Sequence, residues 1–128
     1  MKSNRNDFSA AGSEYQKHLA EFDKFLESLR RLEERLPSLK IGARDSNQVE
    51  VNFLGEVSLL RLKFDYAVSR GVSESTITRL PPQSQASNGM VIKLNGEGDI
   101  GFPNGNWSSN VSRDEDNELV FYYLMNGP

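Results

Sequence analysis

One long amphipathic helix is the feature that most constrains what this chain folds into. From residue 15 to 36, large apolar side chains recur at spacings of three and four, with Glu33 at the one position that breaks the series, and share one helical stripe: Tyr15, Leu19, Phe22, Leu26, Leu29 and Leu36. Three neighbours widen this stripe: His18, Phe25 and Leu32. We expect Ser13 as its N-cap and Pro37 as its stop. Such a helix is about 36 Å long, so it either crosses a whole sheet or projects toward another chain.

After Pro37 the apolar period changes to two, which is typical of half-buried strands. We expect strands over residues 49–53, 56–69, 76–80, 90–94, 99–102 and 119–125. Leu59 beside Leu60 breaks the alternation and predicts a bulge or a change of face. The turn at 95–98 predicts a hairpin in which glycine supplies positive φ. The run 119–125 is apolar on both faces, so we expect a central or doubly covered strand.

Together these elements predict a two-layer α+β domain, in which one long N-terminal helix packs on an antiparallel sheet of about five or six strands. We place this single domain at residues 13–128 and expect residues 1–12 to form a flexible arm. Residues 82–89 and 103–110 have the composition of loops. A chain of 128 residues has the length of one domain and buries enough surface to fold without metal or disulfide.

Charge and cysteine content exclude several classes of function. The chain has 15 basic and 18 acidic residues, and this net charge of −3 argues against a nucleic-acid partner. The absence of cysteine excludes disulfides, thiolate metal sites and thiol nucleophiles. No apolar run approaches the roughly 18 residues of a membrane span, and residues 1–7 are not followed by an apolar signal segment. We therefore expect no membrane partner and a cytoplasmic location.

Residue types that carry chemistry are sparse. His18 is the only histidine, so a multi-histidine metal site is excluded and a packing role on the helix is favoured. A serine triad would need His18 as its base, but no serine lies in a Gly-x-Ser-x-Gly elbow. Asp114, Asp116 and Glu118 alternate like calcium ligands, yet they lack the glycine and distant glutamate of such a loop, which favours a solvated acidic turn. We expect no catalytic residue, metal or cofactor.

Trp107 lies in a polar, glycine-rich stretch rather than on a periodic face. Tryptophan is enriched at binding hot spots, so Trp107 and nearby Phe102 are candidates for presentation to a partner. The alternative is that Trp107 folds back over the edge of the sheet. Arg61 and Lys63 fit either a patch for an acidic partner or a solvated sheet face.

These observations predict a small, non-enzymatic, cytoplasmic protein-binding module, such as an inhibitor, an immunity or anti-defence protein, an adaptor or a chaperone-like protein. Its expected contact residues are Phe102, Trp107, Tyr122, Arg61 and Lys63. A second copy, bound through the helix stripe or a sheet edge, is the other partner to consider. One alternative is a structural subunit of a larger assembly. Another is a ligand-binding or enzymatic pocket between the helix and a curved sheet, lined by Tyr66, Tyr122 and Tyr123 with His18 at its rim.

Overall fold

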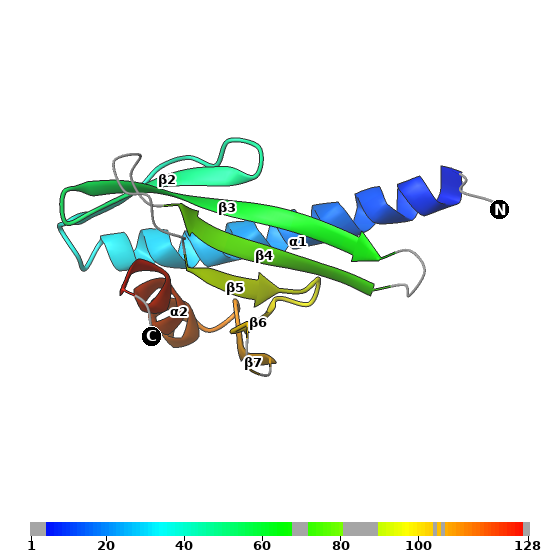
Figure 1. The fold of residues 1–128 in the computed structure, drawn as a ribbon. Coiled ribbons are helices and arrows are strands. Elements are labelled where there is room, and N and C mark those ends of the chain that lie inside the picture. Colours follow the sequence, from blue (N-terminus) through cyan, green and yellow to red (C-terminus); the bar gives the residue numbers. More distant parts are fainter. Residues whose placement is uncertain (1–4, 68–71, 81–89, 104, 106, 127–128) are drawn as a thin grey trace.

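The computed structural model describes residues 5–67, 72–80, 90–103, 105 and 107–126 (Figure 1). These residues form two helices and seven strands: α1 (Arg5–Glu33), β1 (Leu39–Ile41), β2 (Gln48–Phe53), β3 (Glu56–Ala67), β4 (Val72–Leu80), β5 (Val91–Leu94), β6 (Asp99–Gly101), β7 (Trp107–Asn110) and α2 (Asp114–Asn126). The predicted α+β architecture, with an N-terminal helix on an antiparallel sheet, is confirmed. The sheet has seven strands rather than five or six because the short segments β1 and β7 also pair.

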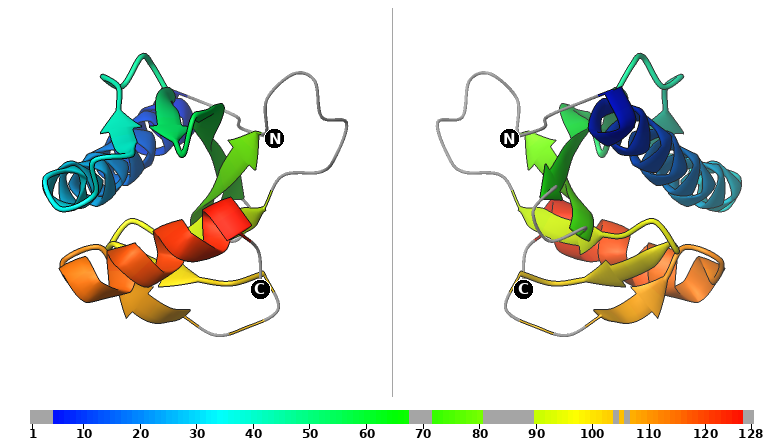
Figure 2. Two further views of the ribbon diagram at one scale, coloured as in Figure 1. Left: turned by 90° about the vertical axis from the view of Figure 1, so that its left-hand side faces the viewer. Right: turned by 90° about the vertical axis from the view of Figure 1, so that its right-hand side faces the viewer.

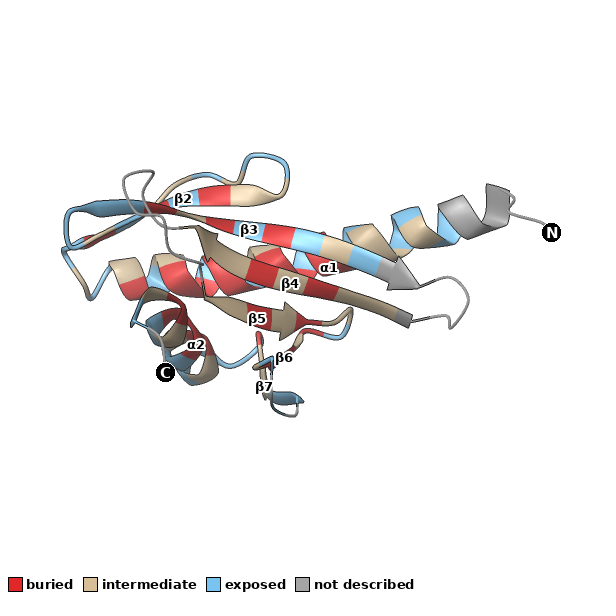
Figure 3. Ribbon diagram, in the orientation of Figure 1, coloured by how far each residue is buried: buried red, intermediate tan, exposed pale blue. Residues whose placement is uncertain are grey.

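Helix α1 is longer at its start than the sequence pattern predicts. It begins at Arg5, so Ser13 lies inside the helix and is not its N-cap, and part of the expected arm is helical. No proline interrupts residues 5–12, and a nucleated helix extends readily through such a segment. The predicted stripe is buried from Leu19 to Leu32, whereas residues 9–17 contain no buried side chain (Figure 3). From Leu19 to Leu32 the stripe packs on its own sheet, while Tyr15 and Leu36 at its two ends are only partly buried.

The strands form a meander in which each strand pairs antiparallel with the next one in the chain. The predicted alternation in β3 is confirmed, with Leu60 and Leu62 buried and Arg61 and Lys63 exposed. The predicted bulge at Leu59 is wrong, because β2 and β3 stay in register from Gln48 opposite Arg61 to Phe53 opposite Glu56. Leu59 is half-buried on the outer face, and Ser58 takes the inner position.

The sheet curls around both helices, and they share one hydrophobic core (Figure 2). Side chains from α1, α2 and the inner face of the sheet form a single cluster. The largest fully buried members on the helices are Phe22, Phe25, Leu26, Leu29 and Leu124. The opposite, outer face of β3 carries Val57 and Leu59 and then the charged side chains of Arg61, Lys63 and Asp65.

The predicted strand at residues 119–125 is wrong, because this segment belongs to helix α2. Its aromatic and branched residues suit a strand, but helical spacing sorts them better: Asn117, Val120, Phe121 and Leu124 are buried, while Leu119 and Tyr122 are exposed. Three acidic residues, Asp114 to Asp116, occupy the first turn, where the helix dipole favours negative charge. The two apolar faces of the sequence are thus one buried face and one exposed face of a helix.

Candidate functional site

An apolar ridge on the outer side of α2 is the most distinctive surface of the structure. Leu119 and Tyr122 form this ridge, with relative exposures of 69% and 67%. They lie three residues apart and so project on the same side of the helix. Glu115 and Asn126 are also exposed and extend the same line toward the two ends of α2. Exposed large apolar side chains that gather in this way mark interaction surfaces.

Two apolar grooves border the ridge. The first groove, of about 650 Å³, lies between α2, the end of α1 and the β2–β3 turn, and its apolar lining includes Leu32, Leu36, Phe53, Leu54, Leu119 and Tyr122. The second groove, of about 630 Å³, lies between α2 and the β6–β7 region and is lined by Phe102, Ser108, Ser109, Val120 and Tyr123 together with the ridge. Leu119 and Tyr122 thus form a wall of both grooves.

Leu54, on the rim of the first groove, occupies an unfavourable backbone position. Leu54 and Gly55 connect β2 to β3 with φ values of 55° and 85°, which match the two positive φ angles of a type I′ turn. Such turns favour Asn-Gly, and a left-handed residue with a Cβ costs about 1–2 kcal/mol. Leu54 is also 69% exposed, so burial in the core offsets little of this cost. A leucine here contributes apolar surface to the groove rather than stability to the turn.

Polar contacts with α1 fix the N-terminal end of α2. Asp114 accepts hydrogen bonds from Arg31 Nη2 and Ser28 Oγ, each at 2.7 Å, and from Arg31 Nε at 3.0 Å. The Arg31 guanidinium and, after it, the Ser28 hydroxyl lower the pKa of Asp114 to about 2. Arg35 forms an ion pair with Glu118 at 3.0 Å. The acidic turn is exposed, as predicted, and it is also bonded to Arg31 of α1 and to Arg35, which follows α1.

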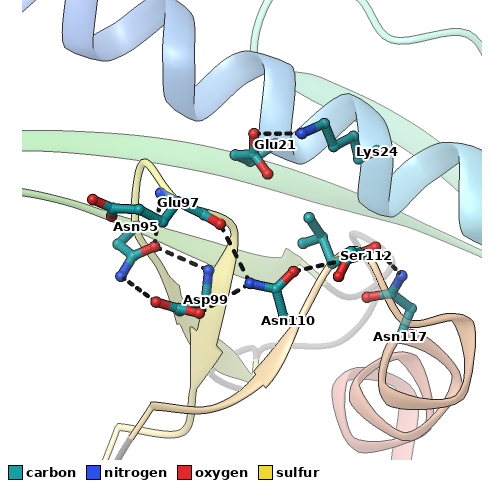
Figure 4. Close-up of polar contacts among 9 residues, drawn as sticks. Glu21, Lys24, Asn95, Glu97, Asp99, Asn110, Ser112 and Asn117 are labelled. Atoms are coloured by element: carbon teal, nitrogen blue, oxygen red, sulfur yellow. Dashed lines mark hydrogen bonds and ion pairs between the residues drawn. The ribbon is translucent and has the colours of Figure 1, made fainter.

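The approach to α2 is held by an amide network (Figure 4). Asn110 Nδ2 donates to Asp99 Oδ1 at 2.9 Å and to the Glu97 carbonyl at 3.3 Å, which joins the end of β7 to the β5–β6 turn. Asn117 Nδ2 donates to the Val111 carbonyl at 2.9 Å. Phe121 packs edge-on against Phe53, with ring centroids 5.7 Å apart. These contacts bury one side of α2 and orient the ridge outward.

The structure separates the predicted contact residues onto two faces. Phe102 and Tyr122 line the second groove, and the Phe102 ring lies 4.6 Å from that of Tyr123. Arg61 and Lys63 are exposed on the outer face of β3, where Arg61 also bonds Gln48. They do not adjoin the ridge, because alternate strand residues point to opposite faces.

Trp107 lies in the edge strand β7 and not in a loop, which corrects the predicted loop at residues 103–110. It faces Gly101 across the β6–β7 pair, and Lys93 Nζ lies 4.8 Å from its ring centroid. Lys93 of β5 lies opposite Gly101 on the other side of β6. Because Gly101 has no side chain, the indole of Trp107 extends across it to Lys93 on the outer face of the sheet. Trp107 thus folds over the sheet edge and is still 40% exposed.

His18 does not lie at the rim of a pocket with Tyr122 and Tyr123, as the alternative of a tyrosine pocket had predicted. Tyr122 and Tyr123 lie on α2, whereas His18 is fully buried against Phe64 of β3, with ring centroids 4.9 Å apart. The side chain of Tyr66 and the loop at 82–89 lie outside the described residues.

His18 belongs to a buried hydrogen-bond chain that sets its tautomer. Ser73 Oγ donates to Glu14 Oε1 at 2.9 Å, so it accepts from His18 Nε2–H at 3.1 Å. His18 Nδ1 then accepts from Ser75 Oγ at 2.7 Å. A serine beside a histidine is the start of a nucleophilic site, but His18 is 0% and Ser75 1% exposed, so substrate does not reach them. These hydrogen bonds form a structural link between α1 and β4.

Protonation of His18 is expected to destabilise the fold. Burial lowers the pKa of His18 below 6.5, although nearby Glu14, Glu97 and Glu21 act to raise it. The unfolded chain therefore takes up this proton more readily, and the free energy of unfolding should decrease as the pH falls below 6.5, by at most about 1.4 kcal/mol per pH unit. Chemical denaturation between pH 7 and 5 measures this slope. In His18→Gln the slope should flatten, and an unchanged slope would assign it to other groups.

Sequence reasoning missed Leu54, Leu119 and the grooves. A signal for α2 was available, since an acidic turn at 114–116 precedes apolar residues spaced three and four apart. No signal in the local sequence marked Leu54, because its role depends on α2 lying beside the β2–β3 turn.

Comparisons with protein-family models, curated proteins and solved structures found no match. Within the described part of the chain, no three acidic or histidine side chains group closely enough to hold a metal ion. Neither described helix is both long and apolar enough to cross a membrane.

Proposed function

We propose that this chain is a non-enzymatic, cytoplasmic protein-binding module whose binding face is the α2 ridge with its two grooves. The observation that carries this proposal is the meeting of three exposed apolar side chains, Leu54, Leu119 and Tyr122, around the first groove. They come from two elements about 65 residues apart, and one of them occupies a backbone conformation that disfavours leucine. Stability alone does not explain such a surface, whereas a partner that covers it does.

The polar rim supports protein binding over a simple solvent-exposed face. Glu118 and Arg35 border the ridge as an ion pair, and Glu115 lies beside them. An apolar centre with charged residues at its edge is the usual anatomy of a protein interface. The buried ring of Phe121 and the ion pair of Asp114 with Arg31 hold this surface in place before a partner arrives, which limits the conformational entropy lost on binding.

Leu54→Asn should separate binding from stability. Asparagine suits the positive φ of the turn, so the free energy of unfolding of the single chain, measured at low protein concentration, should rise by about 1 kcal/mol. Association should weaken because the groove loses an apolar wall. The measurements are chemical denaturation and photo-crosslinking in source-cell lysate, with benzoylphenylalanine replacing Tyr122.

The matched control places the same photo-reactive residue at Arg61 on the outer face of the sheet. Adducts should form from position 122, become weaker in Leu54→Asn, and be few from position 61. Equal adduct yields from position 122 in the chain with Leu54 and in the Leu54→Asn variant would contradict a binding face on α2. Adducts from position 61 alone would contradict it as well.

A further inference from the structure

We infer that the partner of the α2 ridge is a second copy of this chain, bound through its own α2 as an antiparallel helix pair. This inference rests on the proposed function and names the occupant of that face. Its basis is the order of the four exposed residues along α2 and the chemistry of each.

The exposed line on α2 has the spacing of a helix-pairing seam. Glu115, Leu119, Tyr122 and Asn126 follow one another at intervals of four, three and four residues. This is the alternation of the core positions of a coiled coil, and the 13 residues of α2 hold almost two heptads. A seam normally faces another helix, but this one faces away from the rest of the described chain.

The line is complementary to itself when reversed. A two-fold axis between residues 120 and 121 places Leu119 opposite Tyr122 of the second copy, and Glu115 opposite its Asn126. The centre of the pair is then apolar. At each end a carboxylate that accepts hydrogen bonds meets an amide that donates them. Two identical surfaces must match in this way to form an isologous interface, whereas a different partner imposes no such condition.

The charges also favour the reversed orientation. Glu115 is the one carboxylate of the line, and it has no ion pair among the described residues. Its acidic neighbours Asp114 and Glu118 are already paired with Arg31 and Arg35 of their own chain. Asn126 Nδ2 uses one hydrogen on the Tyr122 carbonyl at 3.2 Å and has a second to donate. Antiparallel helices have opposed dipoles, which attract. A parallel pair would place Glu115 against Glu115.

The first groove accommodates the second ridge. Its walls are Leu119 and Tyr122 on one side and Leu36, Phe53 and Leu54 on the other, so a ridge of the same chemistry packs beside them. The interface therefore buries the strained Leu54 in the assembled form.

The test is sedimentation equilibrium over a range of concentrations, in which the wild-type chain should approach twice its own mass. Leu119→Asp should raise the Kd of the dimer by about a hundredfold, because it places a charge at the centre of the interface. Far-UV circular dichroism should show an unchanged fold, since Leu119 is exposed in the single chain.

Charge variants test the orientation. Asn126→Asp places two carboxylates together at both ends of an antiparallel pair and should raise the Kd by about tenfold or more. Glu115→Lys combined with Asn126→Asp should restore dimerisation through two Lys–Asp pairs. Both changes oppose the helix dipole of α2, so recovery in the double variant cannot come from a more stable helix.

Each other outcome overturns a stated part of the inference. A wild-type chain that stays monomeric overturns the dimer, while photo-adducts of position 122 with another protein would leave the proposed function intact. A dimer unaffected by Leu119→Asp uses another surface. A dimer unaffected by Asn126→Asp but strengthened by Glu115→Gln is parallel.

Discussion

Phe121→Ala is expected to lower the free energy of unfolding by about 3–5 kcal/mol. Phe121 is 3% exposed and packs against Phe53, so its removal leaves a cavity between α2 and β2. A helix of 13 residues is marginal without tertiary packing, so the loss should fall on the attachment of α2. Chemical denaturation gives the free energy, and hydrogen exchange should show the largest loss of protection in α2.

Tyr122→Ala is the matched control for this change. The two aromatic residues are adjacent, but Tyr122 is 67% exposed, and at protein concentrations well below the Kd of the inferred dimer its removal should alter the free energy of unfolding by less than about 0.5 kcal/mol. Destabilisation as large as that of Phe121→Ala would show that Tyr122 belongs to the core. The ridge would then not be a free surface, and both proposals for α2 would fail.

Gly98→Ala is expected to lower the free energy of unfolding by about 2–3 kcal/mol, from two causes of similar size. Gly98 has φ +85°, a conformation that disfavours alanine. A Cβ there would lie 2.9 Å from Val111 Cγ2 and in overlap with Glu21 Oε1, and both of these side chains are buried. The turn would have to move away from α1 and from the start of α2.

Two other glycines separate the causes. Gly55 also has φ +85° but nothing lies within 4 Å of an added Cβ, so Gly55→Ala measures backbone strain alone, about 1–2 kcal/mol. Gly96 lies in the same turn as Gly98, and its added Cβ meets His18 Nε2 at an ordinary 3.6 Å, so Gly96→Ala should have the smallest effect. Equal values for Gly98 and Gly55 would show that the side chains around Gly98 yield freely.

Elements whose burial follows one regular period could be predicted from the sequence. The stripe of α1 and the alternation of β3 are examples, because each buries one face and exposes the other. The structure of residues 119–125 was predicted wrongly because α2 is apolar on both sides. A segment with two apolar faces suits a covered strand as well as a helix with a second interface, and local sequence does not distinguish them.

The candidate site was less predictable than the fold. Tyr122 was selected for its place in an apolar run, and the structure does expose it. Arg61, Lys63 and Trp107 were selected by residue type, but strand parity and the β6–β7 register place them away from the ridge. Leu54 joins the site only through a tertiary contact, and tertiary contacts are what single-sequence patterns do not contain.

The meander has a consequence for the order of folding. Each strand pairs with its neighbour in the chain, so the sheet can grow from β1 toward β7 through contacts that each close a short loop. The bonds of Asp114 to Ser28 and Arg31 instead join residues 83 or more positions apart, and they form only after α2 has been synthesised. Until then, the part of the core that Phe121 and Leu124 cover stays open to water. We therefore expect docking of α2 to be a late step in the folding of this core, which leaves the nascent chain prone to aggregation just before α2 emerges.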